Sequence, residues 1–96
     1  MIEVRTTATF DAWFAKLRDP NARQRIQIRI RRLSLGNFGD VKPVGHGVSE
    51  LRIDYGPGYR VYFVRKGRTV VVLLAGGNKG TQAADIKTAL RLARNL

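Results

Sequence analysis

Residues 50–63 read Glu-Leu-Arg-Ile-Asp-Tyr-Gly-Pro-Gly-Tyr-Arg-Val-Tyr-Phe, which predicts a β-hairpin closed by a Gly-Pro-Gly turn. Successive strand residues point to opposite sides of a sheet. The apolar residues of the two strands therefore share one face, and they are Leu51, Ile53, Val61 and Phe63. If this face lines the core, Arg52, Arg60 and Tyr62 converge on the opposite face. Two guanidinium groups beside a phenol suit a phosphate diester, although a solvated sheet face with ordinary surface arginines has the same pattern.

Helical patterns precede the hairpin. Residues 2–5 predict a short opening strand. The apolar residues that follow recur at i, i+3, i+4 and i+7, which is the spacing of a helix with one core-facing side, and they are Phe10, Trp13, Phe14 and Leu17. Asp19 and Pro20 then predict the start of a second helix, as its cap and first residue, and Gly36 ends it. The two helices form an αα-hairpin.

Strand and helix patterns also flank the hairpin on its other side. Residues 37–47 predict a loop or a short strand, and residues 68–75 predict a last strand that is central because it is apolar on both faces. A glycine-rich loop is expected at 76–80, followed by a final helix. The predicted order β-α-α-β-β-β-α describes a single α+β domain over residues 1–96 with a mostly antiparallel sheet.

The charge balance of the chain is unusual. Among 96 residues, 18 Lys and Arg face 7 Asp and Glu, for a formal charge of +11 and a pI near 11.3. Such self-repulsion disfavours the compact state, and a polyanionic partner, either nucleic acid or an acidic protein, would relieve it. The absence of cysteine excludes disulfides and thiolate metal sites, and a single histidine, His46, argues against a metal site made by protein ligands. No apolar run is long enough for a signal peptide or membrane span, so we expect a cytoplasmic protein.

The second predicted helix carries five of the 13 arginines of the chain. Arg25, Arg29 and Arg32 form a stripe, and no acidic residue occurs between Asp19 and Asp40. A solvated helix usually intersperses both signs and gains i,i+4 ion pairs. The stripe is therefore either a face for a polyanion or a merely basic surface.

The element order, with Gly-Tyr-Arg-Val-Tyr-Phe at 58–63 and Gly-Gly-Asn-Lys at 76–79, resembles the RelE/ParE superfamily of type II toxins. The likeness is greatest to the HigB-like branch of addiction module killer proteins, which residues 37–44 and 49–52 also fit. The resemblance implies a toxin that is neutralised by a co-expressed helix-turn-helix antitoxin of the HigA type. Many RelE-like members cleave mRNA on the ribosome, whereas some ParE-like members poison DNA gyrase. The charge alone would support a plain nucleic-acid-binding module.

For a RelE-like nuclease, the resemblance implies metal-independent chemistry without a cofactor. The RNA 2′-hydroxyl attacks its own 3′-phosphate, so a group must take its proton, cations must hold the phosphate, and a donor must serve the leaving oxygen. By position in the family pattern, Arg52 and Arg60 stabilise the phosphate, and Lys79 binds phosphate or donates a proton. Tyr62, or Tyr55, would supply a phenol. The tyrosine and histidine that relatives carry in their C-terminal region are absent, so the pattern identifies no general base.

Further cations are expected to hold RNA and the ribosome, and they are Arg25, Arg29, Arg32, Lys42 and Lys87. Glu50 and Asp54 flank Arg52, and we interpret them as exposed charges rather than as orienting ion-pair partners. Two surfaces are candidates for the antitoxin: the helix over residues 22–35 and the face that carries Lys87, Arg91 and Arg94. We favour the helix over residues 22–35.

Overall fold

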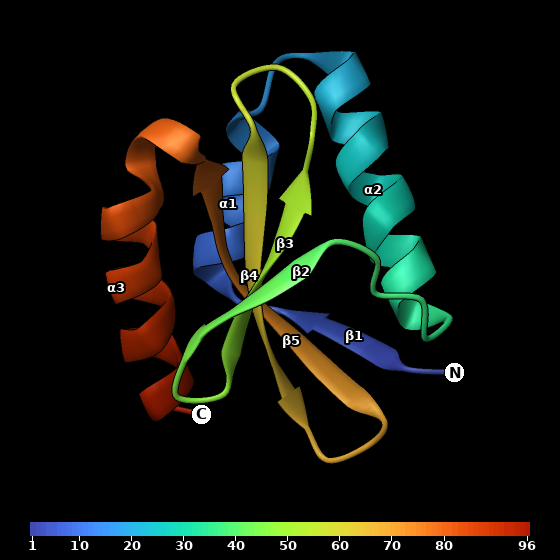
Figure 1. Ribbon diagram of the computed structural model, residues 1–96, viewed down its shortest axis with the longest axis vertical. Helices are drawn as coiled ribbons and strands as arrows, with labels where there is room; N and C mark the ends of the chain where they lie inside the picture. Colours follow the sequence, from blue (N-terminus) through green and yellow to red (C-terminus); the bar gives the residue numbers. More distant parts are fainter.

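Three helices flank a five-stranded sheet in the computed structural model, which describes residues 1–96 (Figure 1). The elements, in chain order, are β1 (Glu3–Thr6), α1 (Ala8–Lys16), α2 (Pro20–Ser34), β2 (Val41–Gly45), β3 (Val48–Ile53), β4 (Tyr59–Lys66), β5 (Val70–Asn78) and α3 (Gln82–Arg94). A single 3-10 turn over Lys79–Thr81 leads into α3. The predicted α+β class is confirmed, with one strand more than the predicted order, because residues 41–45 pair with β3.

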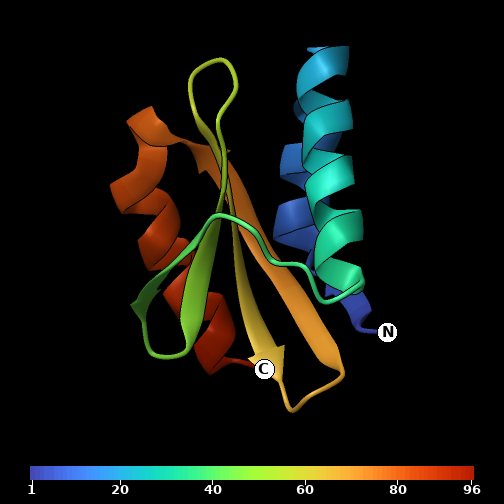
Figure 2. The same cartoon turned by 45° about the vertical axis from the view of Figure 1, so that its right-hand side comes forward.

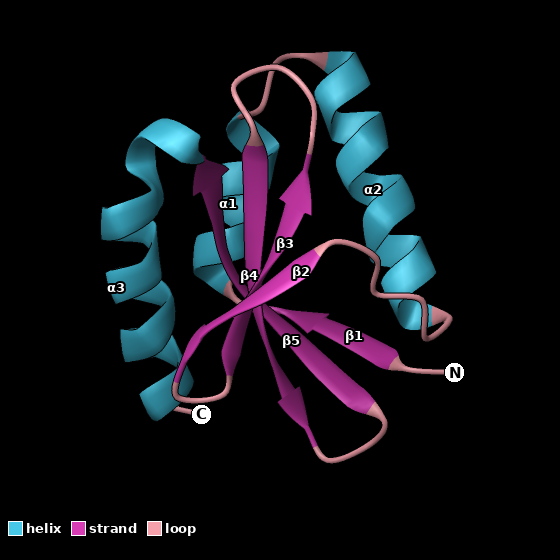
Figure 3. Ribbon diagram, viewed as in Figure 1, coloured by secondary structure: helices cyan, strands magenta, loops and turns pink.

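The sheet is mixed, with strand order β1-β5-β4-β3-β2 (Figure 3). Only β1 and β5 run parallel, and the other neighbours are antiparallel. The central position predicted for the last strand is confirmed, because β5 has a partner on each side and most of its residues are buried. The edge strand β2 contains Pro43, which an edge tolerates because one side of the strand needs no hydrogen-bond donor.

Two hydrophobic cores lie on the two faces of the sheet, and Figure 2 shows α1 and α2 on one face and α3 on the other. The first core contains the hairpin residues Leu51, Ile53, Val61 and Phe63, as their alternation predicts, together with Phe10, Ile26 and Leu33 from the helices. The second core contains Tyr62 and the α3 residue Ala89. The hairpin face that carries Tyr62 is therefore covered by a helix rather than open to solvent.

The two N-terminal helices begin at side-chain caps, and Asp19 is the cap that the sequence predicts for the second of them. The Thr7 hydroxyl accepts a hydrogen bond from the Phe10 amide at 3.1 Å, and the Asp19 carboxylate accepts one from the Asn21 amide at 2.9 Å. Side-chain oxygens at these positions satisfy amides that have no partner within the helix. None of the three helices is both long and apolar enough to cross a membrane.

The glycine-rich segment at 76–80 is only partly a loop, because β5 continues through Gly76 and Gly77 to Asn78. A Cβ atom at Gly76 would overlap the indole ring of Trp13, and one at Gly77 would overlap the carboxylate of Asp85. Glycine within a strand often marks such a close approach. The predicted loop is therefore wrong at Gly76 and Gly77, which pair with β4 as part of the strand. These two positions are glycine because Trp13 of α1 and Asp85 of α3 occupy the space that a side chain would need.

Candidate functional site

A hollow of about 280 Å³ lies where the hairpin meets the end of β5. Arg52 of β3 and Arg60 of β4 are opposite each other in the strand register, and Lys79 follows β5, the next strand of the sheet. All three line the hollow, with Asp40, Ile53, Asp54, Gly58 and Tyr59. The sheet thus brings together three of the four residues that the sequence singles out for catalysis. In Figure 1, the β3–β4 turn, the start of α3 and the α1–α2 connection lie at the same end of the molecule.

Arg60 is held from the interior side by Glu50. One Nη of its guanidinium lies 2.9 Å from a Glu50 carboxylate oxygen, and Gln82 of α3 donates to the other carboxylate oxygen at 3.0 Å. The Glu50 side chain is only 1% exposed, so our interpretation of Glu50 as an exposed charge is wrong. The reason is that α3 covers this face of the hairpin and places Gln82 against the carboxylate.

Arg52 is held more loosely, by a carboxylate at the surface. Its guanidinium lies 3.1 Å from a carboxylate oxygen of Asp40, and the two side chains are 41% and 53% exposed. Surface pairs of this kind contribute at most about 1 kcal/mol to stability. An incoming anion can therefore displace Asp40 from Arg52, whereas Glu50 stays in place beneath Arg60.

Lys79 is the third cation of the hollow. It is exposed at the start of the 3-10 turn and forms no salt bridge. Its side chain lies against Gly58, which closes the hairpin turn with φ of +80°, a conformation that glycine adopts without strain. The hollow therefore presents one fixed cation, one cation with a displaceable partner, and one unpaired ammonium group.

Tyr62, the fourth residue proposed for catalysis, does not reach this hollow. Its side chain is fully buried under α3, and its hydroxyl makes no hydrogen bond. Burial, assisted by the charge of Glu50, raises the pKa of Tyr62 to about 12. Tyr55 is also engaged elsewhere, because its hydroxyl donates to Asp19 at 3.1 Å. The tyrosine that lines the hollow is Tyr59, which sequence reasoning missed although it directly precedes Arg60 in the chain.

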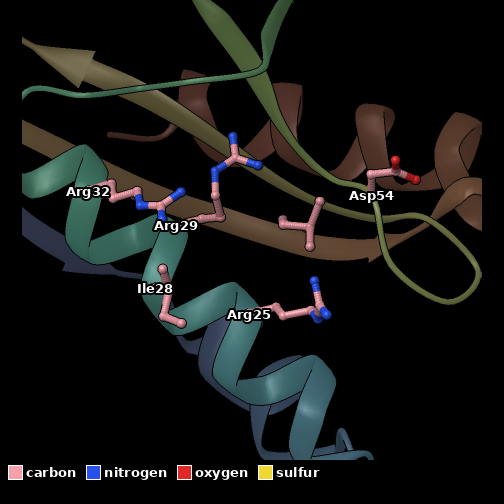
Figure 4. Close-up of a pocket in the computed structure, with 6 residues that line it drawn as sticks. Arg25, Ile28, Arg29, Arg32 and Asp54 are labelled. Atoms are coloured by element: carbon pink, nitrogen blue, oxygen red, sulfur yellow. The ribbon is translucent and has the colours of Figure 1, made fainter.

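The α2 arginines Arg25, Arg29 and Arg32, which Figure 4 labels, have different environments. Arg29 donates to the backbone carbonyl of Arg52 at 2.5 Å and to that of Phe38 at 3.3 Å, and burial lowers its pKa. Arg29 therefore fixes α2 to the hairpin, and it is not a free contact for RNA. The Arg25 guanidinium lies 4.6 Å from the centre of the Tyr55 ring, and Arg32 is exposed.

Lys42 and Lys87 are both exposed, on β2 and α3 respectively. Neither lines the hollow that contains Arg60. The five cations that the sequence groups as RNA contacts are thus spread over three elements, and four of them, Arg25, Arg32, Lys42 and Lys87, are exposed to solvent.

The chain is similar in sequence to known proteins. Residues 12–96 match the family described as phage-derived protein Gp49-like (DUF891). An uncharacterized protein of Haemophilus influenzae is 52% identical over 95 residues, which cover 99% of this chain and 96% of that protein.

Proposed function

Since the chain belongs to the Gp49-like family of phage-derived proteins, a toxin-antitoxin-associated family related to addiction module toxins, we propose that it is the toxin of a type II pair that cleaves mRNA on the ribosome. The observation that supports this function is the hollow in which Arg52, Arg60 and Lys79 meet. Three cations from separate segments, around a space of about 280 Å³, suit one crowded phosphate diester.

In the proposed reaction, the RNA 2′-oxygen forms a bond to the adjacent phosphorus and the bond to the 5′-oxygen breaks. The products are a 2′,3′-cyclic phosphate and a free 5′-hydroxyl, so the 2′-proton is removed and the leaving oxygen gains one. Arg60 and Arg52 stabilise the phosphate, with Arg60 preorganised by Glu50 and Arg52 released from Asp40. Lys79 carries the proton for the leaving oxygen. Asp40 and Asp54 are the carboxylates that line the hollow, and we assign removal of the 2′-proton to one of them.

Docking to RNA uses the exposed cations outside the hollow, which are Arg25, Arg32, Lys42 and Lys87. Contacts with phosphate supply affinity that does not depend on sequence and that weakens with salt. The proposed partners are the ribosome, its mRNA and a helix-turn-helix antitoxin of the HigA type. The site of action is the cytoplasm, where ribosomes are found.

The test is to express the chain alone in bacteria and to follow protein and DNA synthesis by pulse labelling while mapping mRNA 5′ ends. We expect protein synthesis to fall first, with new mRNA ends at codon boundaries. An Arg52→Gln/Lys79→Gln variant, expressed at the same level, should leave growth and mRNA intact. If DNA synthesis fails first and mRNA remains whole, the proposal is wrong and a gyrase-directed toxin of the ParE type replaces it.

A further inference from the structure

A second hollow runs along α2, and Figure 4 shows the residues that line it. It is lined by Arg25, Ile28, Arg29, Arg32, Ile53 and Asp54. An adjoining hollow shares Arg25 and Ile28 and continues toward the start of α2, along Asn21, Gln24 and Tyr55. We call these two connected hollows the α2 groove. Ile53 and Asp54 also line the hollow that contains Arg60, so the two sites are separated only by the end of this strand.

The centre of the α2 groove is apolar and its rim is cationic. Ile28 is 43% exposed, which is unusual for isoleucine in the middle of a helix. Arg25 and Arg32 lie three residues before and four residues after it, so the three side chains share one helix face. Arg29 adds a third, fixed positive charge, and Asp54 is the one carboxylate on the opposite rim.

This combination fits a protein better than RNA. Protein interfaces have an apolar centre and a polar or charged rim. A phosphate backbone gains from the arginines but has no apolar group to cover Ile28. The absence of acidic residues from α2 sets the charge of the occupant, because only an acidic segment complements Arg25, Arg29 and Arg32.

We propose that the α2 groove binds an acidic amphipathic segment of a partner protein, with an apolar side chain on Ile28 and carboxylates on Arg25 and Arg32. This inference rests on the proposed function, because the partner is the antitoxin of the pair. A segment seated in the α2 groove adjoins the hollow that contains Arg60 along Ile53 and Asp54. Its binding occupies two of the cations that dock RNA, so toxin bound to the partner cannot use them on the ribosome.

The test uses the full chain co-expressed with the product of the reading frame adjacent to its own. After purification of the two proteins, calorimetry measures the dissociation constant for the wild type, for Ile28→Gln and for Arg25→Gln/Arg32→Gln. We expect each variant to bind the partner on the order of tenfold more weakly, since an apolar centre and desolvated arginines dominate binding energy. Arg31→Gln is the matched control, because Arg31 is an exposed arginine of α2 outside the groove, and it should change affinity less than twofold.

Three outcomes would contradict either the proposed docking site in the α2 groove or the proposed toxin-antitoxin pairing. If a complex forms but neither groove variant weakens it beyond Arg31→Gln, the α2 groove is not the docking site, while the toxin-antitoxin pairing stands. If no complex forms with wild-type protein, the pairing itself is wrong. If Arg25→Gln/Arg32→Gln weakens binding of a 20-nucleotide single-stranded RNA but leaves partner affinity unchanged, the groove is an RNA surface. Ile28→Gln should leave affinity for the same RNA unchanged, which separates the two occupants.

Discussion

Glu50 and Arg60 form a buried ion pair in which a carboxylate oxygen and a guanidinium nitrogen lie 2.9 Å apart, with side-chain exposures of 1% and 13%. Gln82 donates to the second carboxylate oxygen, so α3 completes the arrangement. A cation held in one orientation beside a reacting phosphate needs no reorganisation during the reaction. The pair therefore links the packing of α3 to the cation that we place under the phosphate.

Arg60→Gln should lower the rate of mRNA cleavage by roughly 10²–10³-fold, since one positioned charge is lost from the transition state. The same change should destabilise the fold by about 3–5 kcal/mol, because it leaves the Glu50 carboxylate buried without its cation. Cleavage in a translating extract and urea unfolding measure the two effects.

The double variant Glu50→Gln/Arg60→Gln separates chemistry from stability. It replaces the ion pair with two amides that can bond to each other, so most of the lost stability should return while cleavage stays low. A double variant that cleaves at the wild-type rate would mean that Arg60 contributes only to the fold.

Asp40→Asn should strengthen binding of RNA, because it removes the carboxylate that competes with phosphate for Arg52. The dissociation constant should be measured with an oligonucleotide that has 2′-deoxy sugars and therefore cannot be cleaved. Any role of Asp40 in proton transfer then has no effect on the measured affinity. We expect affinity to rise a few-fold and stability to change by less than about 1 kcal/mol, since the pair is exposed. In an Arg52→Gln background the same substitution should have no effect on affinity. A gain that persists there would show that Asp40 does not act through Arg52.

Local spacing explains what could be predicted from the sequence. The alternation in β3 and β4 correctly placed Leu51 and Val61 in one core, and Asp19 with Pro20 marked the start of α2. These features depend only on neighbours within a few residues. The alternation also predicts that Arg52 and Arg60 lie together, whereas Lys79 was added from the family resemblance, because no local rule predicts that β5 delivers Lys79 to the hairpin.

What could not be predicted depends on contacts distant in the chain. By alternation, Glu50 and Tyr62 lie on the polar face of the hairpin, which the sequence alone predicts to be open to solvent. Only the packing of α3 buries that face and makes it a second core. Arg29 belongs to an arginine stripe by its spacing, yet its guanidinium bonds to carbonyls of the hairpin and of the segment before β2. Sequence alone gives no sign of which arginine in a stripe is committed in this way.

Gly76→Ala should destabilise the fold by about 1–3 kcal/mol or more, because the added methyl group overlaps the Trp13 indole. That ring cannot easily move, since it packs against Phe10 and Tyr59 with centroids 5.8 and 6.4 Å away. Urea unfolding measures the loss, and combining the change with Trp13→Leu should recover part of it. Gly80→Ala is the control, because its added methyl meets only the Asn78 side chain at 3.1 Å. Equal costs at both positions would point to backbone effects rather than to the indole contact.

Tyr62→Phe should retain mRNA cleavage, because the phenol lies under α3 and outside the hollow that contains Arg60. Stability at neutral pH should be unchanged or higher by up to about 1 kcal/mol, since a buried hydroxyl without a partner is removed. Cleavage assays and urea unfolding on the same preparation check both statements. Loss of cleavage in a variant of normal stability would restore Tyr62 to the reaction and contradict our description of the site.

The same variant tests the alkaline behaviour of the protein. Burial raises the pKa of Tyr62 to about 12 in the folded chain, against an ordinary value of 10.0. Between these two values the unfolded phenol loses its proton while the folded one keeps it, so rising pH favours unfolding. Ionisation of Tyr62 therefore costs the folded state nothing below pH 10, and the loss of stability that it causes grows until the pH passes about 12. Wild-type protein should therefore lose stability more steeply than Tyr62→Phe over this window. Other tyrosines and lysines titrate in both proteins, so the difference between the two urea-unfolding curves isolates Tyr62, and parallel curves would mean that its hydroxyl is solvated.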